Sequence, residues 1–153
     1  MIEEQDRRIL KALQEDGRIS NQELAEKTAM SASACWRRVR ALEQAGVIRR
    51  YTALVNPAEA GLSFHAILHV QLTRHEPGYL DTFIAEVMQR EEVQDCFATT
   101  GEADYHLRVL CRDLDAYNAF LEDVLFRLPG VANVRTNLVL RSIKQETAIA
   151  LSP

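Results

Sequence analysis

The residues with the clearest chemical potential share one face of a helix that we expect over residues 31–46. They recur at the spacing i, i+4, i+7 and i+11, which brings side chains onto one side of a helix. This set consists of Ser33, Arg37, Arg40 and Gln44. A hydroxyl, two guanidinium groups and an amide can bind the phosphates and the base edges of DNA. The pattern therefore predicts a helix that contacts double-stranded DNA in a major groove.

Three neighbouring residues extend or border this face. Ser31 is expected to cap the start of the helix, and it is a further candidate for contact with DNA. Arg38 lies off the face, so it either contacts a flanking phosphate or pairs with an acidic neighbour. Trp36 borders the apolar face of the helix, and we expect this large side chain to pack in the core.

The segments before this helix decide between DNA binding and an arginine-rich surface that is merely solvated. A first helix is expected over residues 4–15. Ser20 and Glu23 have the spacing of a capping box, which predicts a short second helix that ends near Thr28. A very short turn then leads to Ser31, the second N-cap. Helix, short helix, tight turn and longer helix form the helix-turn-helix pattern, which favours DNA binding.

The division of charge along the chain agrees with this interpretation. The whole chain carries a net charge of −4. Residues 1–50 contain ten Lys or Arg and eight Asp or Glu, a net charge of +2, whereas residues 51–153 contain eight and fourteen, a net charge of −6. A basic end on an acidic body fits a DNA-binding head joined to a domain with another task.

The remainder of the chain predicts a sheet and two helices. We expect a strand over residues 47–56, as a wing or a hairpin arm, before a joint marked by Pro57 and Gly61. Beyond it, alternation of apolar residues indicates strands, and a 3.6-residue period indicates helices. The expected strands cover residues 64–73, 93–100, 105–111 and 131–143, and the expected helices cover residues 80–88 and 113–128.

These elements predict an α+β protein of two domains. A winged helix-turn-helix domain is expected over residues 1–50, a strand or linker arm over residues 51–62, and a ferredoxin-like βαββαβ domain over residues 63–153. In the ferredoxin-like arrangement both helices cover one face of a four-stranded sheet. The other face needs cover in so small a protein, so we expect the chain to form at least a dimer.

The sequence resembles the leucine-responsive and asparagine regulator family (Lrp/AsnC) over essentially its whole length. The resembling segments are DRRILKALQEDGRISNQELA, SASACWRRVRALEQAGVIRRYTALVNP, TTGEADYHLRV and LPGVANVRT. The first two resemble the family's helix-turn-helix and the arm after it, and the third resembles a turn in its regulatory domain. The resemblance implies a transcription regulator whose dimers assemble further, as octamers, and bind an amino acid between dimers near that turn.

Carried over by position, the resemblance points to an effector site around this turn. The residues concerned are Thr100, Gly101, Glu102, Asp104 and Asn137. Gly101 would let a backbone amide approach a ligand carboxylate, and Asp104 could accept from the ligand's ammonium group. Both residue types also favour turns, so the alternative is a purely structural turn. Asn137 stands where well-known relatives carry an aromatic residue, which leaves the identity of the amino acid open.

Two other functions are compatible with this fold: a tetrapyrrole decarboxylase and a nucleoid-type architectural DNA binder. The enzyme would need acid and base residues, commonly histidines, around one cavity. His65 and His69 are about 13 Å apart along one strand, too far to share a metal ion, although His106 could lie near either. The basic helix face favours a regulator over the enzyme. Indifference to operator sequence would indicate the architectural binder.

Other features of the sequence predict a cytoplasmic protein without cofactors. Cys35, Cys96 and Cys111 show no C-x-x-C spacing, so we expect reduced thiols and no metal site. No stretch is apolar and long enough to span a membrane, and the polar start does not resemble a signal peptide. We therefore expect no catalytic residues, no cofactor and no membrane partner, with DNA, a small effector and other copies of the chain as partners.

Overall fold

The computed structural model describes residues 2–73 and 78–151. Internal contacts divide the chain into two units. The helical unit comprises Met1–Leu54 together with Lys144–Pro153, and the sheet unit comprises Val55–Ile143. Among the described residues, no helix combines the length and the apolar character that crossing a membrane requires.

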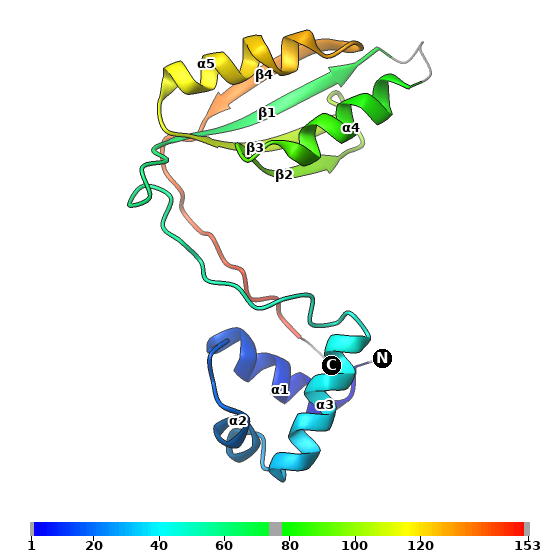
Figure 1. Ribbon diagram of the computed structural model, residues 1–153, viewed down its shortest axis with the longest axis vertical. Coiled ribbons are helices and arrows are strands. Elements are labelled where there is room, and N and C mark those ends of the chain that lie inside the picture. The colour runs from blue at the N-terminus through cyan, green and yellow to red at the C-terminus, as the bar shows by residue number, and fades with distance from the viewer. Residues whose placement is uncertain (1, 74–77, 152–153) are drawn as a thin grey trace. The chain divides into compact units, whose positions relative to one another are not determined.

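The helical unit contains three helices, α1 (Glu4–Glu15), α2 (Asn21–Lys27) and α3 (Ala32–Gln44), which Figure 1 shows in blue to cyan. The predicted capping box is confirmed, because the Ser20 side chain accepts from the amide of Glu23 while the Glu23 carboxylate accepts from the amide of Ser20. Ser31 caps α3 as predicted, accepting from the amide of Ala34. Short-range hydrogen bonds therefore fix where α2 and α3 begin.

The core of the helical unit is formed by one face of each helix. Buried side chains come from α1 (Ile9 and Leu10), α2 (Leu24) and α3 (Cys35 and Leu42). Because α3 uses its Cys35–Leu42 side for this core, its opposite side is left for other contacts.

The strand predicted over residues 47–56 is wrong, since the described residues that follow α3 form turns and irregular structure there. The amides of Val47 and Ile48 both donate to the carbonyl oxygen of Leu42 and so close the end of α3. A strand requires a neighbour that accepts and donates backbone hydrogen bonds. Within the described residues, the single four-stranded sheet offers no such neighbour to this segment.

The sheet unit has the predicted ferredoxin-like order of elements. These are β1 (Phe64–Leu72), α4 (Tyr79–Gln89), β2 (Val93–Ala98), β3 (Tyr105–Cys111), α5 (Leu114–Asp123), the short 3-10 helix η1 (Leu125–Arg127) and β4 (Val131–Leu138). The strands pair antiparallel in the order β2-β3-β1-β4. β4 ends at Leu138, five residues before the predicted end at 143, because its pairing with β1 ends there.

The two faces of the sheet have different surroundings. On β1, Ala66, Leu68 and Val70 are fully buried against α4 and α5, which cover the same face (Figure 1). On the other face, Ile67 is 38% exposed and Phe97 is 59% exposed. Strand alternation and register give this open sheet face the side chains His65, Ile67, His69, Gln71, Phe97, His106, Arg108, Arg135 and Asn137.

The helix α4 buries less of its apolar surface than its sequence predicts. Phe83 and Val87 are buried against the sheet. Leu80, Ile84 and Met88, which follow the same helical period, are 44%, 43% and 80% exposed. The apolar stripe is therefore wider than the area that the sheet covers.

The C-terminal segment belongs to the helical unit, although the predicted second domain extends to residue 153. The Gln14 side chain binds both backbone groups of Ile149: Oε1 accepts from the amide at 2.7 Å, and Nε2 donates to the carbonyl oxygen at 3.1 Å. Leu151 packs against the core of the three helices. The Gln14 side-chain amide thus holds the segment on α1 by pairing with the backbone N–H and C=O of one residue, as a neighbouring β-strand does.

We expect Gln14→Ala to loosen this segment. Each of the two hydrogen bonds contributes about 0.5–1.5 kcal/mol net, so their loss should raise hydrogen exchange at the Ile149 amide roughly tenfold. Exchange monitored by NMR checks this expectation. Gln5→Ala, a change of the same type on the exposed side of α1, is the matched control. Unchanged protection of the Ile149 amide in Gln14→Ala would show that Gln14 does not hold the segment.

Candidate DNA interface and effector site

The predicted DNA-binding face of α3 is open to solvent. Ser33, Arg37, Arg40 and Gln44 are all exposed. Ser31 is also exposed, but its hydroxyl caps the helix and lies 3.4 Å from the hydroxyl of Ser33. At the start of the helix, a surface hollow is lined by Met30, Ser31, Ala34, Arg37, Arg38 and Ala41. Hydroxyl and guanidinium groups therefore gather at the start of α3.

Arg38 differs from the other arginines of α3 because it is held by two carboxylates. Its Nη1 lies 2.9 Å from Asp6 and 2.9 Å from Glu3. The hydrogen bonds that Arg38 donates to Asp6 and Glu3 raise the pKa of its guanidinium. Of the two expectations for Arg38, the structure favours pairing with acidic neighbours. In the described part of the chain, no ion pair of this kind involves Arg37.

Trp36 does not pack in the core, so that prediction is wrong. Its side chain is 53% exposed, and the Arg40 guanidinium lies over its ring at 5.6 Å from the centroid. Such cation–π contacts form readily at exposed tryptophans. The helical period could not separate the two outcomes, because Trp36 lies at the border of the apolar face.

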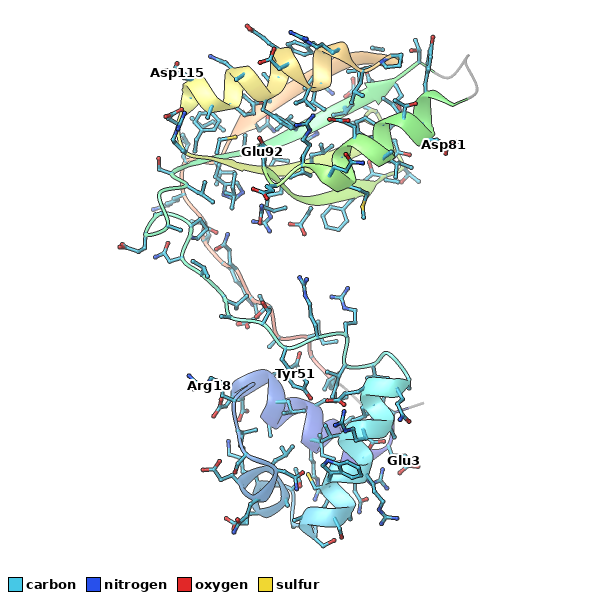
Figure 2. The ribbon with its side chains drawn as sticks, viewed as in Figure 1. Glu3, Arg18, Tyr51, Asp81, Glu92 and Asp115 are labelled. Atoms are coloured by element: carbon cyan, nitrogen blue, oxygen red, sulfur yellow. The ribbon has the colours of Figure 1, made fainter. Side chains whose placement is uncertain are left out.

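Arg40 also takes part in a chain of polar contacts that sequence reasoning missed. Its Nη1 binds Glu43 at 3.1 Å, and the Tyr51 hydroxyl donates to the same carboxylate at 3.1 Å. Burial raises the pKa of the Tyr51 hydroxyl, and the neighbouring Glu43 carboxylate raises it further. Tyr51 follows α3 in the chain and lies within the helical unit (Figure 2). The spacing of Arg40 and Glu43 signals their ion pair, but no local signal places Tyr51 beside it.

The predicted effector residues of the β2–β3 turn take up distinct positions. Gly101 has φ +122°, a conformation that favours glycine, and no atom lies within 4 Å of where a Cβ would be. Thr100 and Glu102 are exposed. Asp104 is fastened to the end of β1, since its carboxylate accepts from the amide of Leu72 at 2.8 Å. Asp104 therefore has a structural task whether or not it also meets a ligand.

Polar contacts join this turn to the open sheet face. Glu102 pairs with Arg135 of β4 at 2.8 Å, and this hydrogen bond holds the pKa of the Glu102 carboxyl below its ordinary value. The Gln71 side chain donates to the carbonyl oxygen of Glu102 at 2.5 Å. Gln71 and Arg135 were not among the predicted residues. The signal was available, because strand alternation sets them on one face with their neighbours two residues away.

Asn137 contacts a histidine rather than the turn. Its Nδ2 lies 3.1 Å from Nε2 of His69, and the His69 ring meets the His106 ring edge-on at 4.5 Å between centroids. Burial lowers the pKa of His69, as do the neighbouring His106 and Arg135. Within the described residues, no three His, Cys, Asp or Glu side chains gather as a metal ion would require. The site thus offers opposite charges at Glu102 and Arg135 and amide and imidazole groups beside them.

Two family descriptions match this chain. Residues 2–49 match a winged helix-turn-helix DNA-binding domain, and residues 65–149 match the Lrp/AsnC ligand binding domain. The leucine-responsive regulatory protein of Salmonella typhimurium is 40% identical over 146 residues, which cover 95% of this chain and 89% of that protein. The corresponding protein of Escherichia coli strain K12 is also 40% identical over 146 residues.

Solved structures agree with the sequence comparison. A transcriptional regulator from Neisseria meningitidis, crystallised as an L-Met complex, is 38% identical with a TM-score of 0.93, covering 99% of this chain and 97% of its own. An AsnC family transcriptional regulator from Agrobacterium tumefaciens is 32% identical with a TM-score of 0.91, covering 97% of both chains. The chain belongs to the Lrp/AsnC family of DNA-binding transcription regulators.

Proposed function

We propose that this regulator reads its operator with α3 and adjusts its assembly and DNA binding to a free amino acid. The observation that carries the proposal is the exposed polar face of α3, with Ser33, Arg37, Arg40 and Gln44 on a capped helix-turn-helix. Ser31 and Arg38 flank this face at the helix start. In a dimer, two copies of α3 enter successive major grooves, so the operator is roughly palindromic with half-sites a whole number of turns apart.

The double change Arg37→Ala with Arg40→Ala should abolish operator binding. Each guanidinium contact is worth about 1–3 kcal/mol, so the loss of both should lower the affinity at least about 30-fold in a gel shift. Lys11→Ala with Arg18→Ala removes the same charge from exposed positions outside α3 and is the control. Full binding by the α3 variant would contradict the assignment. Binding that ignores operator sequence would instead favour an architectural DNA binder.

The effector proposal is supported by the chemistry of the β2–β3 turn. A free amino acid carries an ammonium group and a carboxylate, and Glu102 and Arg135 present the complementary charges 2.8 Å apart. Gly101 adds a backbone without a side chain in the way, while Thr100, Asp104 and Asn137 supply further polar groups. The structural relative from Neisseria meningitidis in complex with L-Met supports an amino acid as the ligand class.

Arg135→Gln should remove the response to the effector. In the unchanged protein, the effector at 100 times its Kd should stabilise the native state by about 2.7 kcal/mol, which raises the unfolding midpoint. A panel of amino acids tested by thermal unfolding identifies it, and Arg135→Gln should show no such rise. Arg127→Gln, which breaks an exposed pair with Asp123 elsewhere in the sheet unit, is the control. An equal rise in Arg135→Gln would move the site elsewhere.

We also propose that copies of the chain pair through the open sheet face, and that the dimers assemble into octamers. Ile67 and Phe97 expose apolar surface there among histidine, amide and guanidinium groups. The exposed stripe Leu80, Ile84 and Met88 on α4 supplies a second surface for contacts between dimers. In a symmetric dimer the same patch of both subunits lies in the interface, so each apolar side chain of the patch is buried twice, once from each subunit.

Ile67→Asp should convert the dimer to a monomer. In a pair formed through the open sheet face, the change buries a carboxylate on each partner, and the cost of removing these charges from water opposes association. Sedimentation velocity measures the outcome. Ala119→Asp places the same charge on an exposed position of α5, on the other side of the sheet, and should leave the dimer intact. A dimeric Ile67→Asp would show that another surface joins the subunits.

A further inference from the structure

Glu43 divides its two carboxylate oxygens between two partners. Oε2 binds Nη1 of Arg40 at 3.1 Å, and Oε1 accepts from the Tyr51 hydroxyl at 3.1 Å. The Glu43 side chain is 27% exposed and that of Arg40 is 59% exposed. The tyrosine therefore orients the less exposed partner of an ion pair whose other partner faces solvent.

This arrangement affects what Arg40 can offer to DNA. Glu43 neutralises part of the charge of Arg40, and the guanidinium also lies over the ring of Trp36. An exposed ion pair contributes little stability and is weakened by salt. A phosphate can thus draw Arg40 away from Glu43, and the ease of that exchange depends on how firmly Glu43 is held.

Tyr51 is also the contact that fastens the departing chain to α3. Backbone hydrogen bonds from Val47 and Ile48 to Leu42 fix the chain as far as Ile48. Among the described residues between Ile48 and Asn56, no backbone–backbone hydrogen bond holds the segment. Through the hydrogen bond from the Tyr51 hydroxyl to Glu43, the position of this segment therefore affects the carboxylate that pairs with Arg40.

We propose that Tyr51 is a positioning residue that acts through Glu43 to restrain Arg40 and so sets how fully α3 engages DNA phosphates. The inference rests on the proposed contact between α3 and DNA. When the segment after α3 moves Tyr51 away, Glu43 is no longer held in the orientation that pairs with Arg40. The Arg40 guanidinium then becomes available to a phosphate. Because Tyr51 restrains Arg40 in this way, the affinity for DNA depends on the conformation of residues 49–54, the stretch that leads out of the helical unit.

The test measures DNA affinity against salt for Tyr51→Phe and Glu43→Gln. Tyr51→Phe keeps the ring and removes only the hydroxyl, and Glu43→Gln removes the countercharge. Both should bind DNA several-fold tighter at low salt. The slope of log K against log salt should steepen by up to about 0.9, the value for one further phosphate contact. Glu26→Gln, which removes the same charge from an exposed position of α2, should leave the slope unchanged.

Repeating both changes with Arg40→Ala identifies the residue through which they act. Affinity and slope should then respond to neither Tyr51→Phe nor Glu43→Gln, because the cation that they release is absent. A merely structural role of Tyr51 would lower the unfolding midpoint without steepening the slope, and this result would overturn the proposal. Equal gains with and without Arg40 would also overturn it. Arg37→Ala tests the proposed contact between α3 and DNA separately from the role of Tyr51. If Arg37→Ala leaves DNA binding intact, the proposed α3 interface itself has failed.

Discussion

The sheet unit depends on β1, which is paired along both of its edges. Antiparallel bonding to β3 and β4 fixes its register, and alternation then assigns each of its side chains to one face. Ala66, Leu68 and Val70 pack in the core, whereas Gln71 contacts Glu102 of the β2–β3 turn and His69 contacts Asn137 of β4. A slip of one residue would exchange the two sets. The register of β1 therefore specifies both the core and the candidate effector region.

The cations of α3 illustrate how one helix can hold similar charges in different states. Arg38 is bound by two carboxylates and contributes to the structure of the helical unit. Arg40 shares a carboxylate with Tyr51 and lies over Trp36, and Arg37 projects from the exposed side of the same helix. The arginines of α3 thus form a graded set of cations, in which acidic neighbours decide how much of each charge remains available for the proposed contact with DNA.

Sequence patterns predicted the parts of the fold that local interactions determine. The capping box at Ser20, the N-cap at Ser31 and the order of strands and helices are confirmed, since each depends on neighbours a few residues away or on a period. Trp36 and the segment 47–56 were mispredicted, because their surroundings depend on distant or absent partners. The candidate effector turn was predicted from family resemblance. Strand alternation indicates which face Gln71 and Arg135 share, but their contacts with the turn depend on the register of the sheet.

With the C-terminal segment attached to α1, the helical unit is built from two separate stretches of the chain. The chain leaves the helical unit after Leu54 and returns to it at Lys144, so the sheet unit is an insertion within the helical unit. The sheet unit is covalently joined to the helical unit at both of its ends, so it cannot be replaced by changing the chain at a single junction. A chimaera that joins this DNA-binding head to the sensor of a relative needs two junctions. In one that ends with the relative's own tail, the two hydrogen bonds of Gln14 would have to form with the backbone of a different residue.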